Sequence, residues 1–185
     1  MNNEEDKQKV ELDCAKEQIA RVCQRLALLH LSFAKTITDK LGKEEGRKLI
    51  LEAIKDYGNR IGVEAKELTE RQGLANTPEN YKSDLPFFGM HEKVEEVKVD
   101  GEDRKRSYGC VMGELWKKLG ENELGRLYCY VDPAKYMAYN PEYVLVHRKS
   151  IPDGDQFCEF IVRKTTKKEQ KDFQSQEQDW SYIDE

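Results

Sequence analysis

The first seventy residues carry an apolar pattern with helical spacing, which limits the folds open to this chain more than any other feature. Apolar residues recur at steps of three and four, so they share one face of a helix. In the first run they are Ile19, Val22, Cys23, Leu26, Leu29, Phe33, Ile37 and Leu41. In the second run they are Ile50, Ala53, Ile54, Tyr57, Ile61, Ala65 and Leu68. Gly42 and Gly73 supply stops, and the short connection between the runs predicts an antiparallel helical hairpin over residues 1–73.

The second predicted helix contains two glycines four residues apart, Gly58 and Gly62. Each costs about 1 kcal/mol relative to alanine inside a helix. Close packing of another backbone against that face would explain them. A ligand at that face or a local kink would explain them equally well.

The chain changes character at residues 73–92, a connector with Thr77-Pro78, Asp84-Leu85-Pro86 and Phe87-Phe88-Gly89. Its two adjacent aromatic residues are expected to need burial. Beyond it, Val97 and Val99 alternate with charged residues, Asp100-Gly101 forms a turn, and residues 104–108 return as a second strand. The connector is therefore followed by a β-hairpin.

Short helices and two further strands complete the predicted fold. One helix presents Val111, Leu115, Trp116 and Leu119 on one face and ends at Gly120, and another runs through residues 124–128. Asp132-Pro133 predicts a third helix with Asp132 as its N-cap, ended by Asn140-Pro141. Strands are expected at residues 143–148 and 156–163, around a loop rich in turn residues.

These elements predict an α+β fold, in which an antiparallel helical hairpin precedes a small antiparallel sheet with inserted short helices. We expect one domain over residues 1–164, with the hairpin at 1–73 and the sheet and short helices at 93–164. Residues 165–185 form a polar, charged tail that is either disordered or docked through Trp180 and Tyr182.

The charge balance limits the partners of this protein. Lys and Arg number 31 against 36 Asp and Glu, so the formal net charge is −5, without the basic excess of a nucleic-acid binder. No stretch approaches the roughly 18 apolar residues of a membrane span, and no secretory apolar core is visible. We expect a cytoplasmic protein that binds neither nucleic acid nor membrane. A homo-oligomer is possible, because two long amphipathic helices offer more apolar face than one small sheet covers.

The five cysteines suit reduced thiols better than a disulfide framework, because their number is odd and their spacing irregular. Cys14 and Cys23 lie in the first helix, where Cys23 is expected to pack in the core. Cys110 follows a glycine at a strand-to-helix junction, where helix N–H groups lower a thiol pKa and favour the thiolate. Cys129 and Cys158 follow at spacings of 19 and 29 residues, which match no zinc motif. A metal site assembled in space remains an alternative.

Other candidate residues have two interpretations each. His147 shares a strand face with Tyr143 and Leu145, so it is either a packed core histidine or half of a Cys–His pair. Asp132 is either a helix cap or a general base. Arg60 and Arg126 either bind a substrate carboxylate or lie at the surface as solvated charges.

The remaining histidines and the acidic pair near the end of the sheet region carry little functional signal. His30 lies beside an apolar stripe and His91 follows the connector, so neither points to a site. Asp153 and Asp155 flank Gly154, an arrangement typical of a turn.

The order of several motifs resembles the L-2-amino-thiazoline-4-carboxylic acid hydrolase family. These motifs are Gly109-Cys110, Leu115-Trp116-Lys117-Lys118-Leu119-Gly120, Leu127-Tyr128-Cys129, Asp132, Tyr139-Asn140-Pro141 and Gly154-Asp155-Gln156-Phe157-Cys158-Glu159-Phe160. The segment Tyr57-Gly58-Asn59-Arg60-Ile61-Gly62 is also similar to one in that family. The resemblance covers roughly residues 44–163. Members often have proline after the first cysteine of the pattern, where this chain has Val111.

The resemblance implies a hydrolase that opens a cyclic, amidine-like C=N bond in a small sulfur heterocycle bearing a carboxylate. We expect no cofactor and no metal. Carried onto matching positions, it assigns Cys110 as nucleophile or polar wall, Asp132 as base or orienting group, and Arg60 as carboxylate anchor. The residues that would line the pocket are Cys129, Asn140, His147 and Cys158.

Two non-enzymatic interpretations stay open. The domain resembles vinyl-reductase-like ligand-binding domains enough to act as a small-molecule sensor. Alternatively, the later cysteines with His147 hold a metal or a cluster.

Overall fold

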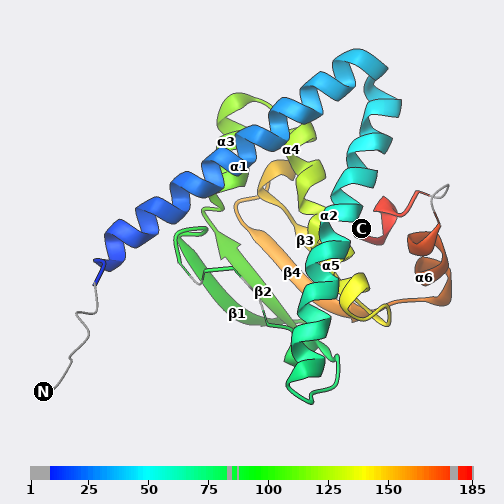
Figure 1. The fold of residues 1–185 in the computed structure, drawn as a ribbon. Helices are drawn as coiled ribbons and strands as arrows, with labels where there is room; N and C mark the ends of the chain where they lie inside the picture. Colours follow the sequence, from blue (N-terminus) through cyan, green and yellow to red (C-terminus); the bar gives the residue numbers. More distant parts are fainter. Residues whose placement is uncertain (1–8, 83–84, 87, 176–178, 185) are drawn as a thin grey trace, which may run out of the picture.

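Two long helices open the chain, and a four-stranded antiparallel sheet with short helices follows (Figure 1). The computed structural model describes residues 9–82, 85–86, 88–175 and 179–184. The predicted α+β class is confirmed. In the connector, Asp84 and Phe87 lie outside the described residues, and Phe88 is 37% exposed.

A sharp corner at Gly42 joins α1 (Leu12–Leu41) to α2 (Lys43–Arg71). Gly42 caps both helices with a φ of +81°, a conformation that favours glycine. The helices diverge from this corner: α1 leans over α3 and α4, whereas α2 runs along α5 (Figure 1). The two helices therefore enclose a wedge above the sheet.

Helix α2 packs closely on α5 (Val131–Tyr139) through its two glycines. A Cβ atom at Gly58 would lie 2.5 Å from the Cβ of Ala134, and one at Gly62 would clash with the Lys135 carbonyl oxygen. Of the three explanations open from sequence, the approach of another backbone is the one observed. This contact fixes the position of α5 above the sheet.

The strands are β1 (Lys93–Val99), β2 (Glu102–Tyr108), β3 (Tyr143–Lys149) and β4 (Cys158–Lys164), ordered β1-β2-β4-β3. The predicted hairpin is confirmed, with Asp100 and Gly101 both at positive φ in its turn. Because paired residues share a face, Lys105, Phe160 and His147 form one row across three strands. A register shift between His147 and Lys149 marks a β-bulge, a feature that re-aims nearby side chains.

The short helices are α3 (Val111–Leu119), α4 (Asn122–Cys129) and α5, with 3-10 turns η1 (Pro78–Asn80) and η2 (Ile151–Asp153). The prediction that Asp132 caps α5 is wrong. Helix α4 runs into α5 through Tyr130, which is the N-cap, so Asp132 falls within the first turn. Its carboxylate is therefore available for other contacts.

The C-terminal tail is docked, which was one of its two predicted alternatives. Helix α6 (Lys167–Gln174) starts with a capping box between Thr166 and Glu169, and η3 (Ser181–Asp184) follows. Apolar side chains of the tail pack in the main core together with side chains of β3 and β4. They are Phe173, Trp180 and Ile183, with Tyr182 partly buried.

The apolar stripe of α1 is only partly covered. Cys23, Ala27 and Leu31 are buried, but Val22, Leu29 and Phe33 are more than half exposed, so the predicted apolar face is not wholly covered. Because α1 and α2 diverge, the rest of the protein covers only one side of α1 (Figure 1). Homo-oligomerisation stays a prediction. Within the described part of the chain, no helix has the length and apolar character needed to cross a membrane.

Candidate functional site

His147 lies buried between two carboxylates. Its Nδ1 atom is 3.0 Å from each carboxylate oxygen of Asp184, and its backbone N–H donates to Asp184 Oδ1 at 2.9 Å. Its Nε2 atom is 3.3 Å from Oδ2 of Asp132. Helix α5, strand β3 and turn η3 therefore meet at one imidazole ring.

Each carboxylate also holds a second cation. Arg126 of α4 donates from Nη2 to Asp184 at 2.7 Å, and Lys135 Nζ lies 2.5 Å from Asp132 Oδ1. We call these five residues, Arg126, Asp132, Lys135, His147 and Asp184, the His147 cluster. Arg126 is thus not a solvated surface charge.

The loop after β3 supports Arg126. The Nε atom of Arg126 donates to Asp153 Oδ2 at 2.8 Å, whereas its Nη1 atom is buried without a hydrogen-bond partner among the described residues. Asp155 accepts the backbone N–H of Ser150 at 2.9 Å, as the turn interpretation predicts. Asp153 thus adds an ion pair to its place in the turn.

The neighbouring charges keep Asp132 and His147 ionised. Burial acts to lower the pKa of His147, but hydrogen bonds to Asp132 and Asp184 outweigh it and raise the pKa to about 9. Burial acts to raise the pKa of Asp132, but Lys135 and His147 together hold it well below its usual range. At neutral pH an imidazolium therefore lies between two carboxylates, and Asp132 is 22% exposed.

Three cysteines converge beside Asp132, from the start of α3, the end of α4 and the start of β4. The electrostatic interactions of Cys110, Cys129 and Cys158 join all three to one another and to Asp132. The Sγ atom of Cys158 also accepts the backbone N–H of Ile151 at 3.5 Å. Cys14 is exposed on α1, as its predicted separation from this group requires, but the predicted separation of Cys23 is wrong, because Cys23 packs in the same core cluster as Cys110 and Cys129 and interacts electrostatically with Cys110.

The expected thiolate at Cys110 is wrong. Burial raises the pKa of this thiol more than the N–H groups of Gly113 and Met112 at the start of α3 lower it. Burial also raises the pKa of Cys158 to about 12 and that of Cys129 well above its ordinary value. All three thiols are therefore protonated at neutral pH.

Arg60 is not brought to this cluster. Its side chain is 76% exposed and pairs with Asp56 at 2.8 Å. It lies two residues from both Gly58 and Gly62, and residues two apart in a helix point in different directions. The glycines face α5, so Arg60 points away from it.

Asn140 has a structural role at the other end of α5. Its Nδ2 group donates to the Asn76 carbonyl at 2.7 Å, and its Oδ1 accepts the Glu142 N–H at 2.9 Å. It lies eight residues after Asp132, about 12 Å along the helix. The side chain ties two loops together, and both ends of its amide are occupied.

Sequence reasoning missed Asp184, His91 and Lys105. Burial lowers the pKa of His91, while the charge of Asp132 raises it and that of Lys105 lowers it, so all three lie within electrostatic reach. Lys105 shares its row with His147, a relation that sequence pairing alone does not reveal. Asp184 gave no signal, because it lies in a polar tail.

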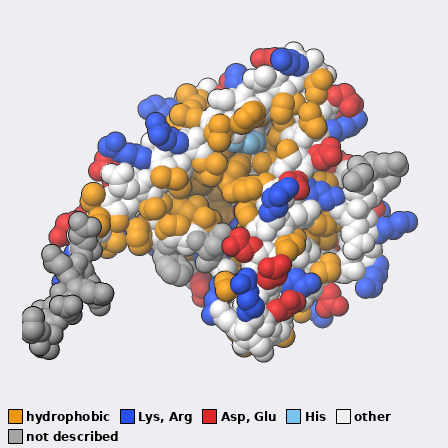
Figure 2. All heavy atoms as spheres, in the orientation of Figure 1, with side chains coloured by type: hydrophobic (Ala, Val, Ile, Leu, Met, Phe, Trp, Pro, Cys, Tyr) orange, Lys and Arg blue, Asp and Glu red, His pale blue; other side chains and the backbone are white. Residues whose placement is uncertain are grey.

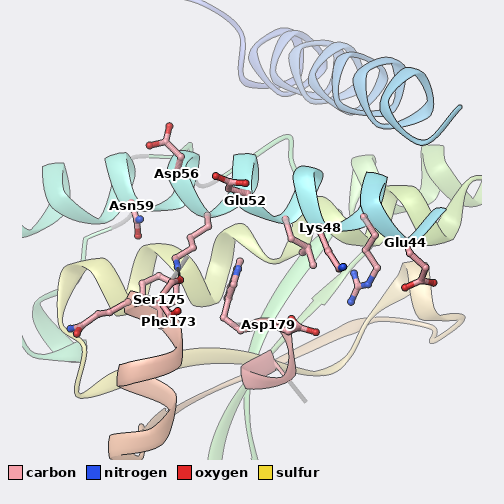
Figure 3. A pocket seen from close by; sticks show the side chains of 13 residues that line it. Glu44, Lys48, Glu52, Asp56, Asn59, Phe173, Ser175 and Asp179 are labelled. Carbon is pink, nitrogen blue, oxygen red and sulfur yellow. Dashed lines mark hydrogen bonds between the residues drawn. The ribbon is translucent and has the colours of Figure 1, made fainter. Parts of the chain in front are cut away.

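The surface of the protein carries two grooves, and neither is lined by a residue of the His147 cluster. Figure 2 shows a hollow lined with hydrophobic side chains beneath α1 and beside α2. A groove of about 840 Å³ reaches His91 and the residues on either side of Cys110. A second groove of about 610 Å³ lies between α2 and the tail, where Lys55 donates to the Ser175 carbonyl at 3.0 Å (Figure 3). Asp132 lines neither groove.

The metal-binding alternative finds no donor set in the described ranges. No group of three or more His, Cys, Asp or Glu side chains there is arranged to hold a metal ion. The three cysteines are gathered, but not as ligands of one ion.

The fold and site define an α+β protein in which short helices, strands β3 and β4 and the C-terminal turn η3 gather a histidine, two carboxylates and three thiols. The chain belongs to the L-2-amino-thiazoline-4-carboxylic acid hydrolase family, whose model matches residues 12–162. Comparison with curated proteins and with solved structures gives no match. The matched region contains every cluster residue except Asp184.

Proposed function

We propose that this protein is a hydrolase that opens the ring of a small carboxylate-bearing heterocycle at its amidine-like carbon. Membership of the family supports the reaction class. The observation that carries the location is Asp132, an ionised and partly exposed carboxylate at the meeting point of His147 and three thiols. The reaction is centred on this carboxylate.

Asp132 binds and orients the amidine-like group of the substrate. Such a group is basic, so it is a cation at neutral pH, and its N–H donors match the two oxygens of a carboxylate. A carboxylate with a strongly lowered pKa is a weak base, which favours orientation over proton abstraction. His147 stands behind Asp132 and keeps it charged.

The proton transfers are assigned to His91. Water oxygen bonds to the amidine-like carbon, the C=N electron pair moves to nitrogen, and a proton leaves the water. The intermediate then collapses: the hydroxyl oxygen forms a carbonyl and releases its proton to solvent, the bond from this carbon to the ring atom breaks, and the departing ring atom takes up the proton first lost by the water. His91 has a lowered pKa and is neutral at pH 7, so it can accept the proton and return it.

Cys110 forms a polar wall of the site. Its thiol is protonated at neutral pH, so it lacks the charge of an activated nucleophile. Water supplies the attacking oxygen directly in this assignment. The protein needs no covalent intermediate for the net addition of one water.

Lys105 anchors the substrate carboxylate, the role that sequence gave to Arg60. It lies in the same sheet row as Phe160 and His147, and within the described chain it forms no ion pair. Its neighbours in β2, Arg104 and Arg106, both bind Glu159 on the other face. Lys105 is thus the residue of this strand left to meet an anion.

The test is incubation of the full chain with 2-amino-thiazoline-4-carboxylate, followed by mass spectrometry. We expect a product heavier than the substrate by one water, formed by the wild type and by Asp13→Asn, whose carboxylate is solvated on α1. Asp132→Asn is expected to reduce the rate about 1,000-fold. Tight binding of the heterocycle by the wild type without turnover would contradict the proposal and favour the sensor alternative.

A further inference from the structure

Asp184 lies outside the matched residues 12–162, yet the hydrogen bonds that its side chain forms with described residues all belong to the site. Its side chain is 1% exposed. One carboxylate group meets the ring and the backbone N–H of His147 as well as the guanidinium of Arg126. A buried carboxylate with such contacts constrains both the direction and the charge of the imidazole.

Turn η3 is held in place by contacts that do not involve the Asp184 carboxylate. Trp180 packs edge-on against Tyr130 at 5.9 Å, and the Ile183 carbonyl accepts from Arg163 at 2.9 Å. Asp179 accepts the backbone N–H of Ser181 at 2.8 Å. The tail is therefore expected to stay docked when the charge of Asp184 alone is removed.

We propose that Asp184 is a positioning residue of this site, which holds His147 as an imidazolium with Nε2 directed at Asp132. The C-terminal segment thereby completes a site whose other residues lie within the matched region. The effect on turnover rests on the proposed function. The effect on His147 itself does not.

The charges that face His147 explain why Asp184 matters. Asp132 approaches from α5 and Asp184 from η3, while the Phe160 ring of β4 packs edge-on at 4.8 Å. Arg126 stands behind Asp184, and Lys135 stands behind Asp132. Neutralising Asp184 leaves the imidazolium with one carboxylate and near a guanidinium whose remaining partner is Asp153, so its protonated form loses stability.

The bulge in β3 supports the same geometry. It lies directly after His147, and the backbone N–H of His147 points out of the ladder to Asp184 rather than to a neighbouring strand. Asp184 thus fixes the backbone and the ring of the same residue. An amide at position 184 can still accept the backbone N–H, but it carries no charge.

The experiment is an NMR titration of the histidine rings in the wild type, Asp184→Asn and Asp172→Asn. Asp172 is a matched control, because it binds Lys168 and Tyr182 within the tail and does not touch His147. We expect the His147 pKa to fall by at least one unit in Asp184→Asn, which means about tenfold less imidazolium at high pH. Asp172→Asn should leave it unchanged, and His147→Gln assigns the signal.

Turnover supplies a second readout. The alkaline limb of the rate profile, near the His147 pKa of about 9 in the wild type, should move to lower pH in Asp184→Asn. An unchanged His147 pKa in that variant would overturn the proposal whatever the rates show. If instead the wild type turns over no heterocycle, the proposed function fails while the titration still decides the role of Asp184.

The wild type alone keeps the proposal testable if Asp184→Asn does not fold. Both ring nitrogens of His147 must then be protonated at pH 8, as their ¹⁵N shifts report. A neutral ring at that pH would overturn the proposal.

Discussion

Two clusters of buried charge lie on opposite faces of the same sheet. The His147 cluster shares a face with Phe160, whereas the adjacent Glu159 points to the other face, because side chains alternate along a strand. There Glu159 binds Arg104 at 2.7 Å and Arg106 at 2.8 Å, and we call these three residues the Glu159 cluster. Both clusters bury a carboxylate against cations.

The two clusters differ in the exposure of their carboxylates and in whether every buried polar atom has a partner. Each oxygen of Glu159 has its own arginine, and this side chain is only 2% exposed. Each oxygen of Asp132 also has its own cation, but Asp132 is 22% exposed, and Arg126 of the same cluster has a buried Nη1 atom without a partner in the described ranges. Burial and charge pairing therefore do not by themselves mark a functional site. The proposed site is distinguished by its partly exposed carboxylate and by unused hydrogen-bonding capacity beside the three thiols.

The largest expected effect comes from the same carboxylate-to-amide change in each cluster. Asp132→Asn should cut turnover about 1,000-fold, because it removes the carboxylate proposed to bind substrate, and it should also lower the free energy of unfolding by about 1–3 kcal/mol, because it weakens the ion pairs with Lys135 and His147. Glu159→Gln should leave turnover per folded molecule unchanged and lower the free energy of unfolding by about 1–3 kcal/mol. Steady-state rates and urea denaturation measure both. If Glu159→Gln were as inactive as Asp132→Asn, the two clusters would not differ in their importance for turnover.

His91→Gln should lower kcat about 100-fold with little change in KM, because it removes a proton carrier and leaves the binding groups in place. His30→Gln is the comparison, since the His30 ring contacts the Leu124 carbonyl at 2.8 Å and lies outside the proposed chemistry. Equal losses in the two variants would indicate a structural effect of losing either histidine.

Lys105→Gln should raise KM about tenfold, close to 1.4 kcal/mol of binding, with kcat retained. Arg60→Gln tests the role expected from sequence and should leave KM unchanged, because that side chain is solvated on α2. A raised KM in Arg60→Gln with an unchanged KM in Lys105→Gln would indicate that Arg60 binds the substrate carboxylate.

The pH dependence of stability probes the charge of His147. Its pKa is raised on folding, so its contribution is complete below the unfolded value near 6.5 and is lost as pH rises through about 9. Wild-type unfolding free energy should fall across this window by up to about 3 kcal/mol more than that of His147→Gln. Parallel curves from urea denaturation would mean that His147 is not stabilised as a cation.

The smallest effect is expected at Cys110. A protonated thiol in the site wall predicts that Cys110→Ser keeps turnover within about threefold of the wild type. Iodoacetamide should label this thiol slowly at pH 7, with Cys14 as the exposed reference. Loss of all activity in Cys110→Ser would contradict this expectation and indicate that Cys110 is the nucleophile.

Local patterns predicted much of the fold. The helical periodicity of apolar residues predicted α1 and α2, and Asp100-Gly101 predicted the hairpin, because both features depend on residues close together in the sequence. Asp132 was misassigned as a cap because the continuation of α4 into α5 depends on packing. The exposure of Phe33 depends on the divergence of two helices, which the apolar pattern does not specify.

The site was only partly predictable for similar reasons. The three later cysteines, Asp132 and His147 do converge, but the thiol pKa values depend on burial, which helix position alone did not reveal. Asp184 depends on the docking of a tail whose sequence is mostly polar. The sequence alone could have excluded Arg60 from the site. It lies two residues from each glycine, so it does not share the helix face on which the glycines pack against α5.

The most direct test is a crystal structure of the slow His91→Gln variant with 2-amino-thiazoline-4-carboxylate bound. The account predicts amidine nitrogens within about 2.7–3.2 Å of the Asp132 oxygens and the carboxylate facing Lys105. A heterocycle bound in the groove between α2 and the tail, with Asp132 untouched, would contradict it (Figure 3).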